Sequence, residues 1–414
     1  MTLPFQPHPQ ESLLLNTVLK RVSVRSVEVL ETGGSPAHVL HITTRENLEI
    51  VLKYLFADDG QVDGHDLASF RLKCIQIQHI RANLPSLQPF YTEILEQFDG
   101  VGWSAYSMPF YRGESITKSL KGPFVDISKF SCDLQSIVQV LVQFGYAAES
   151  IVAPDHYFEE IHIDRVRRRQ WLLFRHLPLE VLSGNYLSIN SQVCIPALTL
   201  IENLRQSVDL LSILQPSELH FPVHGDANLG NFLIQRVPPN NGLVTNLAFK
   251  ILDPRGTLNF MNASYDFAKM LFSLSIFELA MDHGFEIQHL ANRTYKLHLR
   301  GGNAKGYSEA AASFLDILES VEAYRNLTHD FTTKWSWGIL FAHAVHAIAE
   351  SACRLSDQKE RVQGNRHGFE VCQELALGLY LVGTLLLNDL FRAFISHEVP
   401  DIVKHLKSLN TIYS

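Results

Sequence analysis

One short stretch of the sequence carries residue types and a spacing that suit phosphoryl transfer. It is Val223-His224-Gly225-Asp226-Ala227-Asn228-Leu229-Gly230-Asn231, in which a carboxylate precedes an amide by five positions. In phosphoryl transfer a carboxylate orients the attacking hydroxyl, and an amide oxygen helps to hold a metal ion. The spacing therefore predicts Asp226 as the catalytic residue and Asn231 as a metal ligand. An Asp and an Asn at this distance also occur by chance, so a second motif is needed.

That second motif is Asp253-Pro254-Arg255-Gly256, and a β-hairpin would bring it to the first. The apolar runs Phe232–Ile234 and Leu247–Leu252 flank a segment rich in Pro, Asn and Gly, which favours a turn. An antiparallel hairpin places the start of its first strand beside the end of its second, so Asn231 and Asp253 are predicted neighbours. Their oxygens suit Mg²⁺, which takes few protein ligands and completes its shell with phosphate and water.

A lysine in the amino-terminal part completes the predicted site. Lys53 is the only charged residue in the apolar run Ile50–Leu55. On a strand with a period of two, it shares a face with Val51 and Leu55. Phosphoryl transfer needs a lysine on such a strand to pair with the α- and β-phosphates. The alternative is an edge-strand lysine whose ammonium group reaches water.

These residues resemble the motifs of the aminoglycoside phosphotransferase and choline kinase superfamily, whose members are small-molecule kinases. The likeness rests on His224-Gly225-Asp226 with Asn231, and then on Asp253. The segment Ser264–Leu271 is also similar to the helix that follows the metal-binding Asp there. The Asp-Pro-Arg-Gly variant further resembles a bacterial branch found among capsule and surface-polysaccharide proteins.

The resemblance implies an α+β class and a bilobal protein-kinase-like fold. A small antiparallel β-sheet lobe with one helix is expected over residues 1–110, with a hinge near 107–110. A larger, mostly helical lobe is expected over residues 111–414. The likeness is strong over residues 220–275 and looser before them, and residues 285–414 are expected to be a run of helices.

The resemblance also implies where ATP would bind. Besides Lys53, the expected nucleotide contacts are Gly33, Gly34, Ser35, Ser107, Met108 and Arg255. The first three lie in a predicted turn, where glycine lets backbone N–H groups approach phosphates, although any hairpin turn can carry glycines. Ser107 and Met108 lie on the predicted hinge strand, where adenine would bond to the backbone. Arg255 could contact a phosphate or pair with Asp266.

One feature departs from the superfamily. A glutamate on the helix after the lysine strand normally holds that lysine, but the predicted helix Leu67–Leu84 contains no glutamate. Asp63 and Asp66 are the nearest acids. Asp66 could replace the glutamate, or it could cap the helix, which is the commoner arrangement for Asp at a helix start. The apolar positions that indicate this helix are Leu67, Phe70, Ile75, Ile77 and Ile80.

Length and composition restrict the class of protein. With 414 residues, the chain is too long for one compact core. A net charge of −8 argues against a nucleic-acid partner, because neutralising phosphates needs a basic surface.

The longest apolar run, Ala376–Leu387, is shorter than the roughly 20 residues of a membrane span. The amino terminus resembles no export signal, and none of the five cysteines forms a Cys-x-x-Cys pair, so we expect a cytoplasmic protein.

We therefore expect a phosphotransferase that uses ATP and Mg²⁺ and acts on a hydroxyl of a small molecule, such as a sugar or an amino alcohol. About ten residues separate Asp253 from the helix near Ser264, which is too few for a peptide-seating activation segment. Two alternatives stay open. One is a nucleotide-binding pseudokinase with a scaffold function, which the missing glutamate favours, and the other is a phosphotransferase that confers antibiotic resistance. The choice between ATP and GTP, the acceptor and the oligomeric state do not follow from the sequence.

Overall fold

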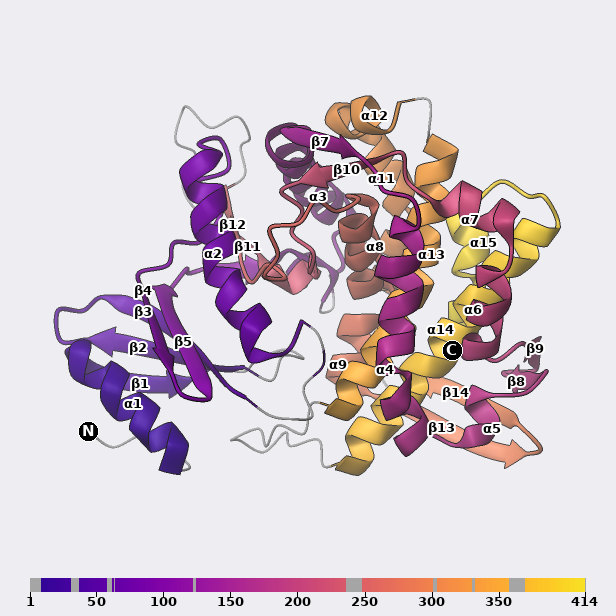
Figure 1. Ribbon diagram of the computed structural model, residues 1–414, viewed down its shortest axis with the longest axis horizontal. Coiled ribbons are helices and arrows are strands. Elements are labelled where there is room, and N and C mark those ends of the chain that lie inside the picture. Colours follow the sequence, from indigo (N-terminus) through magenta and orange to yellow (C-terminus); the bar gives the residue numbers. More distant parts are fainter. Residues whose placement is uncertain are drawn as a thin grey trace. The chain divides into compact units, whose positions relative to one another are not determined.

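Two units of different composition make up the described part of the chain. The computed structural model describes residues 9–30, 37–57, 62, 64–121, 124–235, 248–300, 304–329, 332–356 and 369–413. Unit 1 contains the described residues of Met1–Glu114 and Asn231–Leu258, and unit 2 those of Ser115–Gly230, Asn259–Ser356 and Gly368–Ser414. Unit 1 is built on a β-sheet and unit 2 is mostly helical, which confirms the predicted α+β class (Figure 1).

The sheet of unit 1 has five antiparallel strands in the order β1-β2-β3-β5-β4. They are β1 (Val24–Val29), β2 (His38–Thr44), β3 (Glu49–Phe56), β4 (Glu96–Gly100) and β5 (Trp103–Pro109). Side chains of a strand point alternately to its two faces. In β3, Leu52 and Tyr54 therefore join one apolar cluster, and Val51 and Leu55 join another. As predicted, Lys53 lies in β3 on the face of Val51.

One helix packs on each face of this sheet. Helix α1 (Pro9–Arg21), which the sequence did not predict, packs its apolar side chains with Leu52. Helix α2 (Leu67–Asn83) packs on the other face, with Val51. Its buried positions are Phe70, Lys73, Cys74, Gln76, Ile77 and Ile80. Ile75, one of the apolar positions that indicated the helix, is exposed, because the helical turn of about 100° per residue carries it away from the buried side.

The predicted hairpin is confirmed. Strands β11 (Phe232–Gln235) and β12 (Ala248–Ile251) pair antiparallel, with Phe232 opposite Ile251. Ile251 N–H donates to Phe90 O at 2.8 Å, and Thr92 N–H donates to Ile251 O at 3.1 Å, so the hairpin is fastened to the rest of unit 1. The predicted turn between the strands lies outside the described residues.

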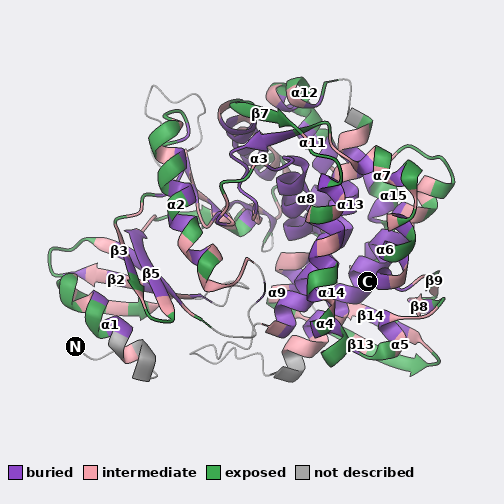
Figure 2. Cartoon of the chain, viewed as in Figure 1, coloured by how far each residue is buried: buried purple, intermediate pink, exposed green. Residues whose placement is uncertain are grey.

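Two long helices, α13 (Thr332–Ser356) and α14 (Phe369–Ile395), form the buried centre of unit 2 (Figure 2). Around them stand the shorter helices α3 (Ile127–Leu141), α4 (Asp164–His176), α5 (Leu179–Leu182), α6 (Ala197–Arg205), α7 (Val208–Leu214), α8 (Ser264–Phe272), α9 (Glu278–His283), α10 (Lys305–Ala312), α11 (Phe314–Ser320), α12 (Glu322–Thr328), α15 (Ile402–His405) and α16 (Asn410–Tyr413). A five-stranded sheet with a helix after its third strand, followed by helices, is the element order predicted for a bilobal protein-kinase-like fold.

Unit 2 also contains two small sheets. Strand β7 (Glu149–Val152) pairs with β10 (Glu218–Phe221), and a second sheet has the order β13-β14-β8-β9. Its strands are β8 (Leu187–Ile189), β9 (Gln192–Cys194), β13 (Phe285–Ala291) and β14 (Thr294–Leu299). The prediction that only helices follow residue 285 was wrong. Asn292 and Arg293 adopt positive φ angles and turn the chain, so the alternating apolar residues on either side pair as a hairpin.

Helix α14 is long and apolar enough, by length and composition, to cross a membrane between Cys372 and Ile395. However, 78% of the most apolar stretch of this helix is buried inside the protein, as in a helix of a protein core. The five cysteines are free thiols. The cytoplasmic location stays a prediction from the sequence.

Candidate functional site

The carboxylate of Asp253, in unit 1, is held between two lysines. Lys53 Nζ, from β3, lies 2.8 Å from Asp253 Oδ2, and Lys73 Nζ, from α2, lies 2.7 Å from Oδ1. The side chain of Asp253 is 17% exposed, that of Lys53 is 9% exposed and that of Lys73 is 8% exposed. Burial alone would raise the pKa of Asp253, but the two ammonium groups outweigh it and hold the pKa below its usual range. Asp253 is therefore an anion at neutral pH.

The hairpin brings Asn231 and Asp253 to the same end of unit 1's two short strands. Asn231 ends a 3₁₀ turn, and its backbone oxygen accepts from Leu252 N–H at 2.9 Å. Asn231 is thus opposite Leu252, and Asp253 is the next residue along. Asp253 has a φ angle of +51°, a left-handed conformation that is uncommon for residues other than glycine and that occurs often at functional sites.

Helix α2 also holds the turn that follows Asp253. The side-chain oxygen Oε1 of Gln76 accepts from Gly256 N–H at 2.8 Å and from Thr257 N–H at 3.0 Å. Gly256 has a φ angle of +85°, and a Cβ atom there would lie 2.2 Å from Ser69 O. A side chain at position 256 would therefore collide with the helix backbone, and only glycine allows this close approach.

Asp66 caps α2 and is not the partner of Lys53. Its carboxylate accepts from Ser69 N–H at 2.9 Å, from Ser69 Oγ–H at 2.8 Å and from Gly64 N–H at 3.1 Å. Partial burial raises the pKa of Asp66, but these hydrogen bonds outweigh it and lower the pKa. Asp63 lies outside the described residues. Lys53 pairs with Asp253, and α2 contributes Lys73 to the same carboxylate where an acid was expected.

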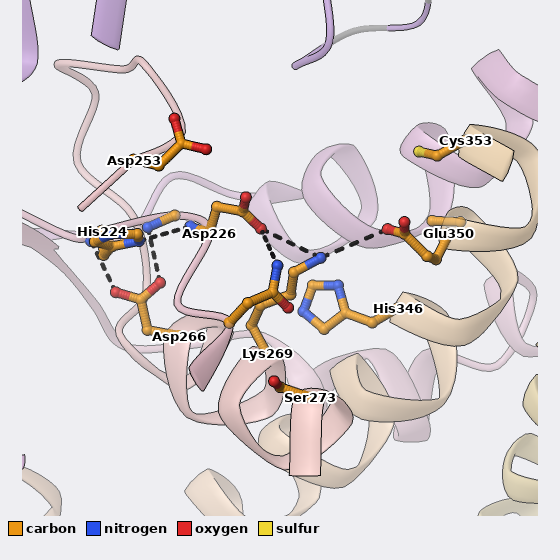
Figure 3. Close-up of polar contacts among 12 residues, drawn as sticks. His224, Asp226, Asp253, Asp266, Lys269, Ser273, His346, Glu350 and Cys353 are labelled. Carbon is orange, nitrogen blue, oxygen red and sulfur yellow. Dashed lines mark hydrogen bonds and ion pairs between the residues drawn. The ribbon is translucent and has the colours of Figure 1, made fainter. Parts of the chain in front are cut away.

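The loop that carries Asp226 belongs to unit 2 and is braced by Asp266 of α8 (Figure 3). His224 N–H and Gly225 N–H each donate to the Asp266 carboxylate at 2.8 Å, as does the hydroxyl of Tyr146. His224 Nδ1 in turn accepts from Asp226 N–H at 3.2 Å. Burial raises the pKa of Asp266, and the hydrogen bonds it accepts offset only part of that rise. Asp266 and His224 therefore fix the loop conformation.

The carboxylate of Asp226 is held by one ion pair and one amide. Lys269 Nζ, from α8, lies 3.3 Å from Asp226 Oδ1, and Asn228 Nδ2 donates to the same oxygen at 3.1 Å. Lys269 is 5% exposed and also lies 3.7 Å from Glu350 Oε2 (Figure 3). The other oxygen of Glu350 pairs with Arg354 at 2.7 Å. Asp226 itself is 31% exposed, so a fixed carboxylate faces a partly open environment.

The remaining predicted nucleotide contacts are spread over unit 1. Ser107 and Met108 are buried in β5, where Ser107 O accepts from Leu95 N–H at 2.8 Å. Arg255 is half-buried in the turn after Asp253. The predicted phosphate loop, 33–35, lies outside the described residues.

Sequence reasoning missed four charged or polar residues of these clusters: Lys73, Gln76, Lys269 and Glu350. The first two fall on the buried stripe of α2, three or four positions from Phe70 and Ile80. The third is the only charge between Phe267 and Leu271 of an otherwise apolar segment. A lone charged residue inside an apolar run was the signal that identified Lys53. The same signal was available at Lys269 and Glu350, but not at Lys73, which has Arg71 two positions before it, or at Gln76, which is uncharged.

Comparisons with family models and with curated proteins found no match. The chain is similar to several solved structures. An amicoumacin kinase in complex with AMP-PNP and Ca²⁺ is 11% identical, with a TM-score of 0.49, over 91% of this chain and 93% of that one. A glucosamine kinase is 11% identical, with a TM-score of 0.42, over 95% and 99% of the chains. An aminoglycoside phosphotransferase from Streptomyces rimosus, in complex with ADP and streptomycin, is 12% identical, with a TM-score of 0.42, over 79% and 98%.

Proposed function

We propose that this protein is a phosphotransferase that moves the γ-phosphate of ATP to a hydroxyl of a small molecule. One observation carries the proposal: β3 and the β11–β12 hairpin deliver Lys53, Asn231 and Asp253 to one place in unit 1. The hairpin register sets Asn231 and Asp253 at one end, and the Lys53–Asp253 ion pair joins the third residue to them. A phosphate-binding lysine beside two hard oxygen ligands is the set that phosphoryl transfer needs.

The residues fit Mg²⁺. Asn231 and Asp253 offer oxygen donors, and the lysines keep Asp253 ionised, so the donor set matches a hard divalent cation. These two residues would hold the ion, which when bound would neutralise charge on the phosphates. Lys53 would bind the α- and β-phosphates, and Arg255 is a further candidate for a phosphate contact.

Asp226 is the residue that we propose orients the acceptor hydroxyl. Its carboxylate would accept a hydrogen bond from that hydroxyl and take the proton late in the transfer, when the bond to phosphorus forms. Lys269 and Asn228 hold one carboxylate oxygen and so fix the direction in which the group points. His224 and Asp266 hold the loop backbone and take no part in proton transfer. Most of the rate enhancement would come from such positioning and from charge stabilisation.

A small molecule is the acceptor that the chain favours. Only residues 254–263 join Asp253 to the start of α8 at Ser264, and an ordered peptide-binding segment would not fit in that length. The resemblance of Asp253-Pro254-Arg255-Gly256 to surface-polysaccharide proteins makes a sugar or sugar derivative the class to test first. An aminoglycoside-like antibiotic is a second class.

A nucleotide-binding pseudokinase is the second candidate function. The observation that favours it is Lys73, a lysine on α2 where active relatives would carry an acid. The presence of Asp226, Asn231 and Asp253 opposes it. Such a protein would bind nucleotide without transferring phosphate, so binding and turnover have to be measured separately.

The first test is thermal unfolding with Mg-ATP, with Asp253→Ala as the control. A ligand at a hundred times its dissociation constant should stabilise the fold by about 2.7 kcal/mol. We expect a shift that requires Mg²⁺ and is weaker in the variant. The absence of a shift with both ATP and GTP would contradict the proposal.

Turnover then separates the two candidates. Release of ADP would be followed with panels of sugars, amino alcohols and aminoglycosides as acceptors. Acceptor-dependent ADP release supports the phosphotransferase. Tight Mg-ATP binding with no release across the panels would favour the pseudokinase.

A further inference from the structure

Lys73 is placed unusually for a buried lysine. It lies in the middle of α2, among the apolar side chains that face the sheet, and its ammonium group contacts Asp253 at 2.7 Å. A buried ammonium group is costly unless an anion accompanies it. Asp253 is that anion, but Asp253 also carries the ion pair with Lys53 at 2.8 Å. One carboxylate thus receives an ammonium group on each of its two oxygens.

A divalent cation would compete with both lysines for Asp253. The metal would take carboxylate oxygens that Lys53 and Lys73 hold, and like charges so close together repel. Both ammonium groups would then turn to another anion nearby. Lysine can do so, because its ammonium group sits on a flexible four-carbon stem. The phosphates that accompany the metal are the anions at hand.

We propose that Lys73 is a second phosphate-binding residue, which contacts the nucleotide phosphates together with Lys53 when a metal occupies Asp253. The ligand class is the metal complex of a nucleoside diphosphate or triphosphate. The inference rests on the proposed function and extends it. The departure of α2 from the expected pattern then has a function, because the helix adds a positive charge to the phosphate site in place of an acid that would neutralise Lys53.

Two consequences follow for binding. Affinity should rise steeply from nucleoside to nucleoside diphosphate, because both lysines act on the phosphates. A divalent cation alone should bind weakly, because it must displace ammonium groups that have no phosphate to turn to. If Lys73 only braced Asp253, its loss would not distinguish between ligands with and without phosphates.

The test is calorimetric titration of the full chain with ADP plus Mg²⁺, and separately with adenosine. The proteins are the wild type, Lys73→Met, Lys73→Arg and Lys250→Met. Lys250 is a matched control in unit 1, since its Nζ bonds to the backbone oxygen of Pro89 and not to Asp253. We expect Lys73→Met to weaken ADP roughly 10- to 100-fold and to leave adenosine unchanged. Lys73→Arg should keep most of the ADP affinity, and Lys250→Met all of it.

Unchanged ADP affinity in Lys73→Met would overturn the inference and leave the proposed function intact. An equal loss of ADP and adenosine would also overturn it, because the lysine would then support the whole site and not the phosphates. A wild type that binds neither ligand would overturn the proposed function and this inference with it. If Lys73→Met does not fold, Lys73→Gln keeps a hydrogen-bond donor for Asp253 without the charge, and the same comparison of ADP with adenosine decides.

Discussion

The two carboxylates that the proposed chemistry depends on, Asp253 in unit 1 and Asp226 in unit 2, are held in opposite ways. Asp253 is 17% exposed and has a lysine on each oxygen. Asp226 is 31% exposed, and its lysine, Lys269, is shared with a second acid, Glu350. In these contacts the charged neighbours of Asp253 are two lysines, whereas the lysine that contacts Asp226 is matched by a second acid, Glu350. The first arrangement suits a group that meets phosphates, and the second suits one that meets a neutral hydroxyl.

The largest expected effect is on turnover, and it should separate the two carboxylates. Asp226→Asn should lower turnover by about 10²- to 10⁴-fold, because the amide cannot accept the acceptor's proton. Nucleotide affinity should stay near the wild-type value, whereas in Asp253→Asn it should fall. ADP release and calorimetric titration measure the two quantities. A loss of nucleotide binding in Asp226→Asn would show that the carboxylates do not have the separate functions proposed.

The free energy of unfolding should also separate the two carboxylates, but here Asp253→Asn should have the larger effect. Asp253→Asn leaves Lys53 and Lys73 without this carboxylate, and removing one member of a buried ion pair costs about 3 kcal/mol or more. In Asp226→Asn, Lys269 keeps Glu350, so the free energy of unfolding should change by about 1 kcal/mol or less. Urea denaturation of both variants makes the comparison. Equal losses would mean that the lysines of unit 1 are stabilised by other groups.

The turn after Asp253 offers a sharper test of unit 1. Gly256→Ala places a Cβ atom 2.2 Å from Ser69 O at a φ angle of +85°, so α2 must shift. We expect the free energy of unfolding to fall by about 2 to 3 kcal/mol. Gly230→Ala is the matched control, because a Cβ atom there meets nothing within 4 Å. A Gly256→Ala protein as stable as the control would show that the turn and α2 can separate freely.

As the pH falls, unit 2 should lose stability at a higher pH than the cluster of Lys53, Lys73 and Asp253 in unit 1. Burial lowers the pKa values of His343, His346 and His405 in unit 2, that of His405 to about 3. The unfolded chain takes up these protons below about pH 6.5 and the folded chain does not, so stability falls as the pH falls, and His405 alone accounts for about 2 kcal/mol at pH 5. The pKa of Asp253 is lowered, so its contribution persists well below pH 5.

Unfolding free energies at pH 7, 6 and 5 measure this slope. The variant His405→Gln should lose less stability between pH 7 and pH 5 than the wild type, because one site of proton uptake is gone. An unchanged slope would mean that His405 is protonated in the folded chain.

Much of unit 1 could be predicted from the sequence, because its signals are local. The alternation around Lys53 and the two strand runs that flank a turn indicate strands directly, and the structure confirms both. What could not be predicted was which side chains of α2 join the cluster around Lys53 and Asp253. That depends on the rotation of α2 relative to the sheet, which brings Lys73 and Gln76 inward, and a local pattern does not fix such a rotation. The ion pair between Lys269 and Glu350 could not be predicted either, because it joins α8 to α13, which are far apart in the sequence.

The β11–β12 hairpin has a consequence for how relatives of this chain would be recognised. Asn231 and Asp253 are kept in place by hydrogen bonds at the end of the ladder away from the connection between the strands, so the number of residues in that connection does not set their separation. Insertions or deletions in that connection could accumulate through evolution while the two ligands stay together. A search that fixes the sequence interval between the two motifs would pass over such relatives, whereas one that treats the interval as free would retain them.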